Sequence, residues 1–372
     1  MNRKETVAAF YSLIQAGLWE KECRLKEFEV VDFNEIYKLA QEQSVVGLVT
    51  AGLEHVIDVD LPKDVVLQFI GETMQIEQRN NAMNSFIGVT IDKMRAADIY
   101  TILVKGQGVA QCYERPSWRS SGDVDLLLDR YNYDKAKSYL KPLASSVGKE
   151  IVDELHLGLT IGHWEVELHG TLHSELSFRI DRQLDEIMHT IFSEDLVRKW
   201  RNGATNICLP RPDEDVIFVF THILQHFYKG GIGLRQICDW CRLLWTYRDS
   251  INLGLLESRI RKMGLMSEWR AFGTFAVDYL GMPEDAMPFY TNKRCWNRKA
   301  RGISSFIIDV GNFGHNRDSS YYTKYPFVIR KVISLSRRLA DLFRHSRHFP
   351  LDSIRFLPSL MFTGIRSAFK LR

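Results

Sequence analysis

The spacing of apolar residues predicts helices over the first part of the chain. Apolar side chains recur every three or four positions in residues 33–56 and again in residues 61–97, which is the spacing of one helix face. Pro62 suits the first turn of the second helix, because that turn needs no backbone N–H donor. We therefore expect a helical N-terminal domain over residues 1–95.

The pattern changes at Ile99, where short apolar and alternating runs begin to alternate with helical ones. The predicted elements are a strand over 99–106, a helix over 108–116 that Pro116 stops, a strand over 123–129, a helix over 131–148 that Gly148 stops, and strands over 155–162 and 164–170. Such an order indicates a compact α/β unit around a small mixed sheet, which we place at residues 96–175.

After His173 the helical pattern returns, and its clearest break is a loop over residues 202–215. We assign residues 176–323 to a helical C-terminal domain and residues 324–372 to a basic C-terminal segment. In that segment we expect Pro358 and Gly364 to interrupt any long helix. The fold class is therefore α+β and mainly helical, with helical domains on both sides of the small sheet.

Composition indicates the cellular compartment in which the protein is expected. The 372 residues contain no uncharged apolar run near twenty residues, so no transmembrane helix is expected. The first residues have no apolar segment followed by a small-residue cleavage site, unlike a secretory signal. The six cysteines are scattered along the sequence without the spacing of a disulfide framework, so we expect them to be reduced thiols. We expect a cytoplasmic protein.

Charge is distributed unevenly along the chain. The basic C-terminal segment holds eleven Lys and Arg against two Asp, a balance of +9, so the rest of the chain is at −6 for a total of +3. Such a segment either caps the helical domain or contacts an acidic partner. We favour capping, leave membrane contact open, and do not expect nucleic acid as a partner, because no nucleic-acid-binding module is recognisable outside this segment.

The candidate chemistry lies in the α/β unit. Asp123 and Asp125 point to the same face of their predicted strand, and two adjacent carboxylates repel each other unless a cation lies between them. Such an oxygen-rich pair suits Mg²⁺ together with substrate phosphates. Glu165, Glu167 and His169 share one face of the last strand, so one of these glutamates could be a third carboxylate ligand. An ordinary edge strand with solvated acids is the alternative.

The surrounding residues favour phosphate chemistry. The first strand ends in Lys105-Gly106, and Arg119 with Ser120-Ser121-Gly122 leads directly into the two aspartates. Glycine permits close approach of the backbone to a phosphate. The order strand–KG–helix–R-x-S-G-D-x-D–helix–strands–V-E-L-H resembles the polymerase-β-like nucleotidyltransferase superfamily, and more closely its uncharacterised bacterial nucleotidyltransferases. The histidine pair His222 and His226 and the pair Arg235 and Asp239 extend this resemblance into the C-terminal helices.

The resemblance implies roles for individual residues. Asp123, Asp125 and Glu167 would be catalytic and would hold two Mg²⁺ ions, and Gly106 and Gly108 would lie against the phosphates of a nucleoside triphosphate such as ATP. The superfamily's Gly-Ser is replaced here by Lys-Gly-Gln-Gly, so Lys105 or Gln107 would substitute for the serine. Arg119 is either a phosphate clamp or an arginine that holds its loop by pairing with an aspartate. His169 would orient a carboxylate.

The implied reaction is the attack of an acceptor hydroxyl on the α-phosphate, with release of pyrophosphate and Glu167 as a possible general base. The acceptor is not identified. A non-catalytic nucleotide-binding or antitoxin-like module and a tRNA-type nucleotidyltransferase remain as alternatives. A zinc site of His222, His226, Cys238 and Cys241 is also compatible with the spacing, but buried helix-packing cysteines are the favoured interpretation.

Overall fold

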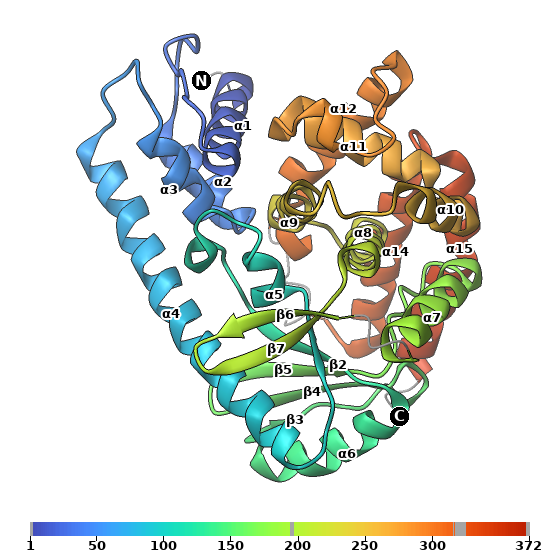
Figure 1. Cartoon of the computed structure of the whole chain (residues 1–372). Helices are drawn as coiled ribbons and strands as arrows, with labels where there is room; N and C mark the ends of the chain where they lie inside the picture. The colour runs from blue at the N-terminus through green and yellow to red at the C-terminus, as the bar shows by residue number, and fades with distance from the viewer. Residues whose placement is uncertain (1–2, 194–196, 315, 317–324, 370–372) are drawn as a thin grey trace.

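The computed structural model describes residues 3–193, 197–314, 316 and 325–369, and it is mainly helical with two small sheets (Figure 1). The predicted α+β class is therefore confirmed. None of the helices within these residues is long and apolar enough to cross a membrane.

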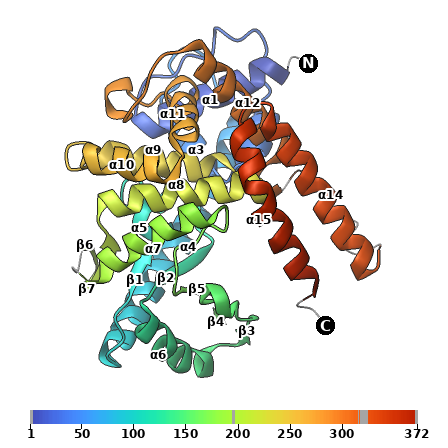
Figure 2. The same ribbon diagram turned by 90° about the vertical axis from the view of Figure 1, so that its right-hand side faces the viewer.

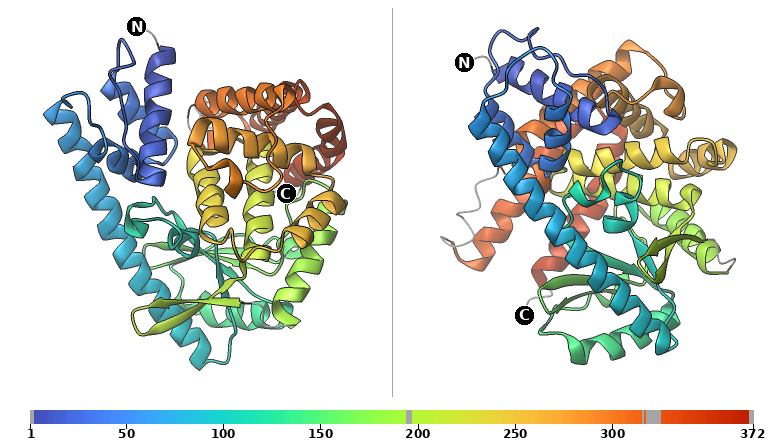
Figure 3. Two further views of the ribbon diagram at one scale, coloured as in Figure 1. Left: turned by 45° about the horizontal axis from the view of Figure 1, so that its top comes forward. Right: turned by 60° about the vertical axis from the view of Figure 1, so that its left-hand side comes forward.

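Four helices precede the sheet, and the last of them runs along its edge (Figures 1 and 3). They are α1 (Arg3–Trp19), α2 (Phe33–Glu42), α3 (Val46–Glu54) and α4 (Lys63–Ala96). The predicted run over 33–56 is divided into α2 and α3 because Ser44 takes a left-handed conformation with φ of 57°. Pro62 directly precedes α4 and adjoins its first turn as expected.

The larger sheet has five strands in the order β1-β2-β5-β4-β3. The strands are β1 (Ile102–Val104), β2 (Asp123–Leu127), β3 (Ser146–Val147), β4 (His156–Ile161) and β5 (Trp164–His169). Only β2 and β5 are parallel, so the sheet is mixed, as the sequence predicts. One face of the sheet packs on α4 and on α6 (Arg130–Leu140), with Val124, Leu126 and Val166 buried in that core.

Two predicted helices of the α/β unit are shorter in the structure. α5 (Gly106–Ala110) ends well before Pro116, and α6 ends at Leu140 instead of continuing to Gly148. Pro142 explains the second difference, because it has no N–H to continue the helical ladder and lies in a 3₁₀ turn that leads into β3. The 3₁₀ helices are η1 (Pro116–Trp118), η2 (Lys141–Leu143), η3 (Val152–Glu154), η4 (Glu284–Ala286) and η5 (Asn312–Gly314).

A second sheet lies where the sequence predicted a loop within helical structure. β6 (Val197–Asn202) and β7 (Thr205–Pro210) form an antiparallel hairpin around Gly203 and Ala204. Gly203 has φ of +60°, which suits the primed turns that close two-residue hairpins. The hairpin packs against α4 and β1, so it extends the core behind the larger sheet.

The C-terminal helices stack over the open face of the sheet (Figure 2). They are α7 (Phe178–Ser193), α8 (Pro212–Lys229), α9 (Leu234–Thr246), α10 (Leu253–Met263), α11 (Met266–Leu280), α12 (Arg294–Val310), α14 (Phe327–Ser346) and α15 (Pro350–Phe369). Buried residues of α1–α3 and of these helices form one continuous core. Tyr11, for example, bonds to Ser304 through their hydroxyls at 2.9 Å. The domain limits at 1–95, 96–175 and 176–323 stay predictions.

The basic C-terminal segment contributes the last two helices, which pack side by side (Figure 2). α15 is continuous through Pro358, so the expected interruption of this helix is wrong. Its buried side chains supply the reason: Phe356 is fully buried against Tyr228, and Phe349, just before α15, is buried against Phe227. Both side chains are on the same helix face and pack against α8, and this burial compensates for the hydrogen bond that the proline cannot make.

Candidate active site

The parallel pairing of β2 and β5 brings the acidic residues together. Asp123 lies opposite Glu165 and Asp125 lies opposite Glu167, so all four side chains are on the same sheet face. The ligand oxygens of Asp123, Asp125 and Glu167 all lie within 4.8 Å of one another. Glu165 instead accepts a hydrogen bond from Thr160 at 2.9 Å and does not line the cleft. Three carboxylates at this spacing can hold a divalent cation.

Lys105 and His169 partly neutralise this acidic cluster. Lys105 Nζ lies 2.9 Å from Asp125 Oδ1, and His169 Nε2 donates to the same oxygen at 2.7 Å. Burial opposes the ionisation of Asp125, but the charge of Lys105 and the hydrogen bond from His169 outweigh it, so the pKa of Asp125 is lowered. The negative charge of Asp125 and burial together raise the pKa of Asp123. The two aspartates therefore differ in acidity: the pKa is lowered for Asp125 and raised for Asp123.

The turn between β1 and α5 presents two of the predicted nucleotide-binding residues. Lys105 has φ of 55°, an uncommon conformation for a residue with a side chain, and Gly106 follows with φ of +40°. Both line the cleft next to the carboxylates. Gln107 and Gly108 do not: Gln107 is buried and donates to Asn80 and Ser121, and a side chain at Gly108 would meet Leu209 of β7 at 2.8 Å. Gln107 and Gly108 therefore pack against other parts of the protein and do not face the cleft.

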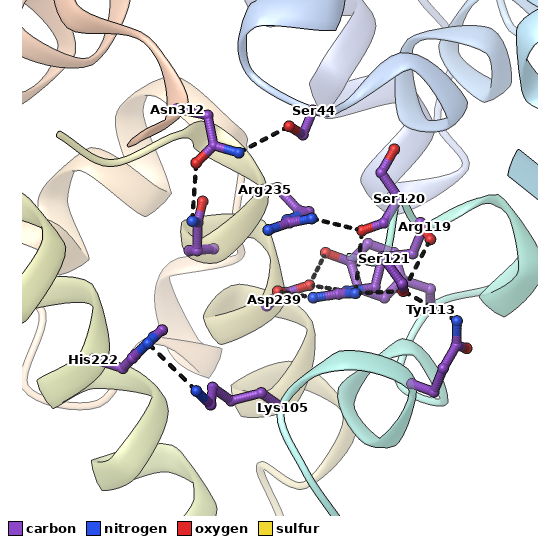
Figure 4. Close-up of polar contacts among 12 residues, drawn as sticks. Ser44, Lys105, Tyr113, Arg119, Ser120, Ser121, His222, Arg235, Asp239 and Asn312 are labelled. Atoms are coloured by element: carbon purple, nitrogen blue, oxygen red, sulfur yellow. Dashed lines mark hydrogen bonds and ion pairs between the residues drawn. The ribbon is translucent and has the colours of Figure 1, made fainter. Parts of the chain in front are cut away.

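Arg119 forms a buried pair that holds the loop before β2 (Figure 4). Its Nε and Nη2 donate to the two oxygens of Asp239, each at 2.7 Å, and Tyr113 donates to Asp239 at 2.8 Å. Its Nη1 donates to the hydroxyl of Ser121 at 2.9 Å. Arg119 thus pairs with an aspartate and fixes the loop. A role as phosphate clamp stays a prediction and would require this pair to open.

Arg235, which is part of the family resemblance, is a further cation of the cleft. Its Nη1 donates to the carbonyl of Ser120 at 2.9 Å (Figure 4), whereas its buried Nε has no partner. Among the described residues, no carboxylate forms an ion pair with it, because Arg119 occupies Asp239. Burial and the positive charge of Arg119 lower the pKa of Arg235. An anion in the cleft would satisfy this side chain.

Helices α8 and α9 form the opposite wall of the cleft, whose volume is about 450 Å³. This size is typical of small-molecule sites, which span about 300–1,000 Å³. His222 accepts from Lys105 at 3.5 Å and lies 3.1 Å from His226. Burial and the nearby charge of Lys105 hold the pKa of His222 well below its usual value and lower that of His226 to about 4. Both rings are therefore neutral at physiological pH.

The predicted zinc alternative is not assembled. Cys238 and Cys241 are fully buried in the helical core, whereas His222 and His226 line the cleft. Within the part of the chain that the structure describes, the groups suited to a metal ion are Asp123 with Asp125 and Glu167, and His156 with Glu167 and His169. Neither contains a cysteine, which agrees with buried helix-packing cysteines.

His156 is a cleft residue that the sequence does not single out. It begins β4, and the antiparallel register places it directly opposite His169 on β5. Its Nε2 lies 3.3 Å from Glu167 Oε2. The strand was predicted, but no sequence signal gives the register that brings the two histidines together.

The comparisons with known proteins agree with this geometry. A sequence model described as an uncharacterised nucleotidyltransferase matches residues 29–281, which is more than half of the chain. No curated protein and no solved structure shows a significant match. The matched region contains every residue of the cleft named above. The chain therefore belongs to this family of uncharacterised nucleotidyltransferases.

Proposed function

We propose that this protein transfers a nucleoside monophosphate from a nucleoside triphosphate to an acceptor hydroxyl in the cleft, with release of pyrophosphate. The observation that carries the proposal is the convergence of Asp123, Asp125 and Glu167 on one face of β2 and β5. Family membership supports nucleotidyl transfer as the reaction class. Membership of the polymerase-β-like superfamily, which the order of sequence motifs resembles, is part of the proposal.

The donor set suits Mg²⁺, because all three ligand groups are carboxylates with oxygens in mutual reach. When bound there, Mg²⁺ would neutralise developing charge on the phosphates. Glu167 is held ionised: hydrogen bonds from His156 and His169 hold its pKa well below the usual range. A carboxylate whose pKa is lowered stays ionised and can bind a cation, and the role of Glu167 as general base stays a prediction.

The remaining cations suggest how the triphosphate is held. Lys105 lies between the carboxylates and α8, and Arg235 faces the cleft without a carboxylate partner among the described residues. We assign the contact with the triphosphate to Arg235 and to the Lys105–Gly106 turn. Arg119 acts as a positioning residue, because its pair with Asp239 fixes the loop that starts β2.

Calorimetric titration of the four nucleoside triphosphates, with and without Mg²⁺, tests this proposal. We expect Mg²⁺-dependent binding of at least one of them, its loss in Asp123→Asn, and affinity within about two-fold of wild type in the control Glu165→Gln. Asp123→Asn should remain at least as stable as wild type without ions, because it relieves repulsion with Asp125. If Asp123→Asn binds as wild type does, the site assignment is wrong.

A further inference from the structure

We propose that His156, Glu167 and His169 form a second ion site, with imidazole donors, for a divalent transition-metal ion such as Zn²⁺ or Co²⁺. The site adjoins the carboxylates assigned to Mg²⁺ and shares Glu167 with them, but it does not depend on nucleotide binding. It deepens the proposed function, because it gives the cleft two neighbouring cation sites of different donor chemistry.

The strand register creates this second site. His156 and His169 lie directly opposite each other on β4 and β5, with ring centroids 5.0 Å apart. Glu167 is two residues before His169 on the same strand, so its side chain is on the same face. A ring nitrogen of each histidine and an oxygen of Glu167 lie within 4.8 Å of one another, and an ion bound through His169 Nε2 would replace its hydrogen bond to Asp125. All three side chains line the cleft.

The distances from Glu167 to the two rings are long for hydrogen bonds and also fit two ligands of one ion. Glu167 Oε2 lies 3.3 Å from His156 Nε2 and 3.4 Å from His169 Nε2. These separations exceed the usual range of an N–H···O bond, which is about 2.7–3.2 Å. A tetrahedral Zn²⁺ with ligands at about 2.0–2.1 Å sets neighbouring ligand atoms about 3.3–3.4 Å apart. The two measured separations therefore match a shared ion.

The donor chemistry decides which ion is preferred. Imidazole nitrogen suits zinc and other transition ions, whereas Mg²⁺ prefers oxygen ligands. The three side chains are 16–34% exposed, so an ion can enter from the cleft. Three protein ligands with solvent access leave a position open for water or a substrate oxygen, which is the arrangement of catalytic rather than structural zinc sites.

Cobalt titration of the nucleotide-free full-length protein tests the site, since Co²⁺ in a nitrogen–oxygen site absorbs visible light. In buffer with millimolar Mg²⁺, we expect one equivalent of Co²⁺ to bind with such absorption and to be displaced by Zn²⁺. His156→Gln should weaken Co²⁺ binding at least ten-fold. His163→Gln is the matched control, because His163 is exposed at the turn between the same two strands. The Co²⁺ affinity of this variant should stay within two-fold of wild type.

Unchanged Co²⁺ affinity in a folded His156→Gln protein would overturn the proposal, and so would a sulfur-to-cobalt absorption band, which places the ion at a cysteine. If His156→Gln does not fold, His169→Gln serves as the second variant with the same expected loss. The two proposals fail separately. If Co²⁺ binds but no nucleotide binds with Mg²⁺, only the proposed nucleotidyl transfer is contradicted. If a nucleotide binds with Mg²⁺ but Co²⁺ does not bind, only the second ion site is contradicted.

Discussion

Two arginines of the cleft are close together but have opposite surroundings. Arg119 uses three of its nitrogens in bonds to Asp239 and Ser121, whereas Arg235 makes one side-chain bond, to the carbonyl of Ser120. Breaking a buried ion pair by removing one partner typically costs about 3–5 kcal/mol. Removing Arg235, a partly buried cation with no carboxylate partner among the described residues, costs little and relieves repulsion with Arg119.

We therefore predict that Arg119→Gln lowers the free energy of unfolding by about 3 kcal/mol or more. Arg235→Gln should leave stability nearly unchanged or raised, yet weaken binding of the nucleoside triphosphate about ten-fold or more, because it removes a charge-assisted bond to phosphate. Urea denaturation and calorimetry measure the two effects. A stable Arg119→Gln, or an Arg235→Gln protein with wild-type affinity, contradicts this division of roles.

The sequence predicts the carboxylates better than their partners. Alternation along each strand places Asp123 with Asp125, and Glu165 with Glu167, on one face, and the family resemblance implies Glu167 as the third carboxylate. Asp239 and Arg119 are separated by 120 residues, and His156 meets His169 only through the strand register. Local periodicity contains no information on such long-range pairs, so the partners of the site could not be predicted from it.

At the scale of elements, the hairpin of β6 and β7 differs most from the expectation. Gly203-Ala204 suits a two-residue hairpin turn that starts with glycine, but the flanking residues do not alternate strongly, so the sequence predicts a loop there. The helix predicted over 131–148 is too long, because Pro142 ends it before Gly148. The strands β1, β2, β4 and β5 were predicted, because β-branched and alternating residues identify them.

The hairpin turn yields a direct test with a matched control. Gly203 has φ of +60°, so Gly203→Ala should destabilise the protein by about 1–2 kcal/mol. Gly71 lies in α4, and a side chain there meets nothing within 4 Å, so Gly71→Ala should stabilise the protein by about 0.5–1 kcal/mol. Thermal unfolding distinguishes the two. Equal effects of the two substitutions would argue against the hairpin.

At the scale of the whole molecule, the cleft depends on both the sheet and the C-terminal helices. The sheet supplies the carboxylates, α8 supplies His222 and His226, and α9 supplies Arg235; Figure 4 shows His222 and Arg235. The helices before and after the sheet share one core, so the two walls of the cleft are fixed relative to each other. Sequence periodicity predicts the helices on either side but not that they pack together.

This arrangement predicts how stability depends on pH. His226 faces His222, Lys105, Lys229 and Arg235, and burial together with these cations lowers its pKa to about 4, below the 6.5 of an unfolded chain. The unfolded chain therefore binds protons more readily, so stability is complete above about pH 6.5 and declines as pH falls toward 4.

Other groups change stability in other pH ranges. His169, whose pKa is raised, changes it above pH 6.5, and Asp125 and Glu167, whose pKa values are lowered, change it in more acidic solution. Thermal midpoints measured from pH 7.5 to 5 should fall for wild type and fall less for His226→Gln. A His226→Gln protein with the same pH profile as wild type would show that this ring is not held neutral in the folded state.

The central claim is that Asp123, Asp125 and Glu167 hold the cation that binds the triphosphate. A crystal structure with Mn²⁺ in place of Mg²⁺ and a nucleoside triphosphate analogue that resists cleavage at the α-phosphate tests it most directly. We predict anomalous scattering from an ion between these carboxylates, with the phosphates lying toward Arg235 and the Lys105–Gly106 turn. An analogue bound outside this cleft, or an ion that does not contact Asp123 and Asp125, would contradict the claim.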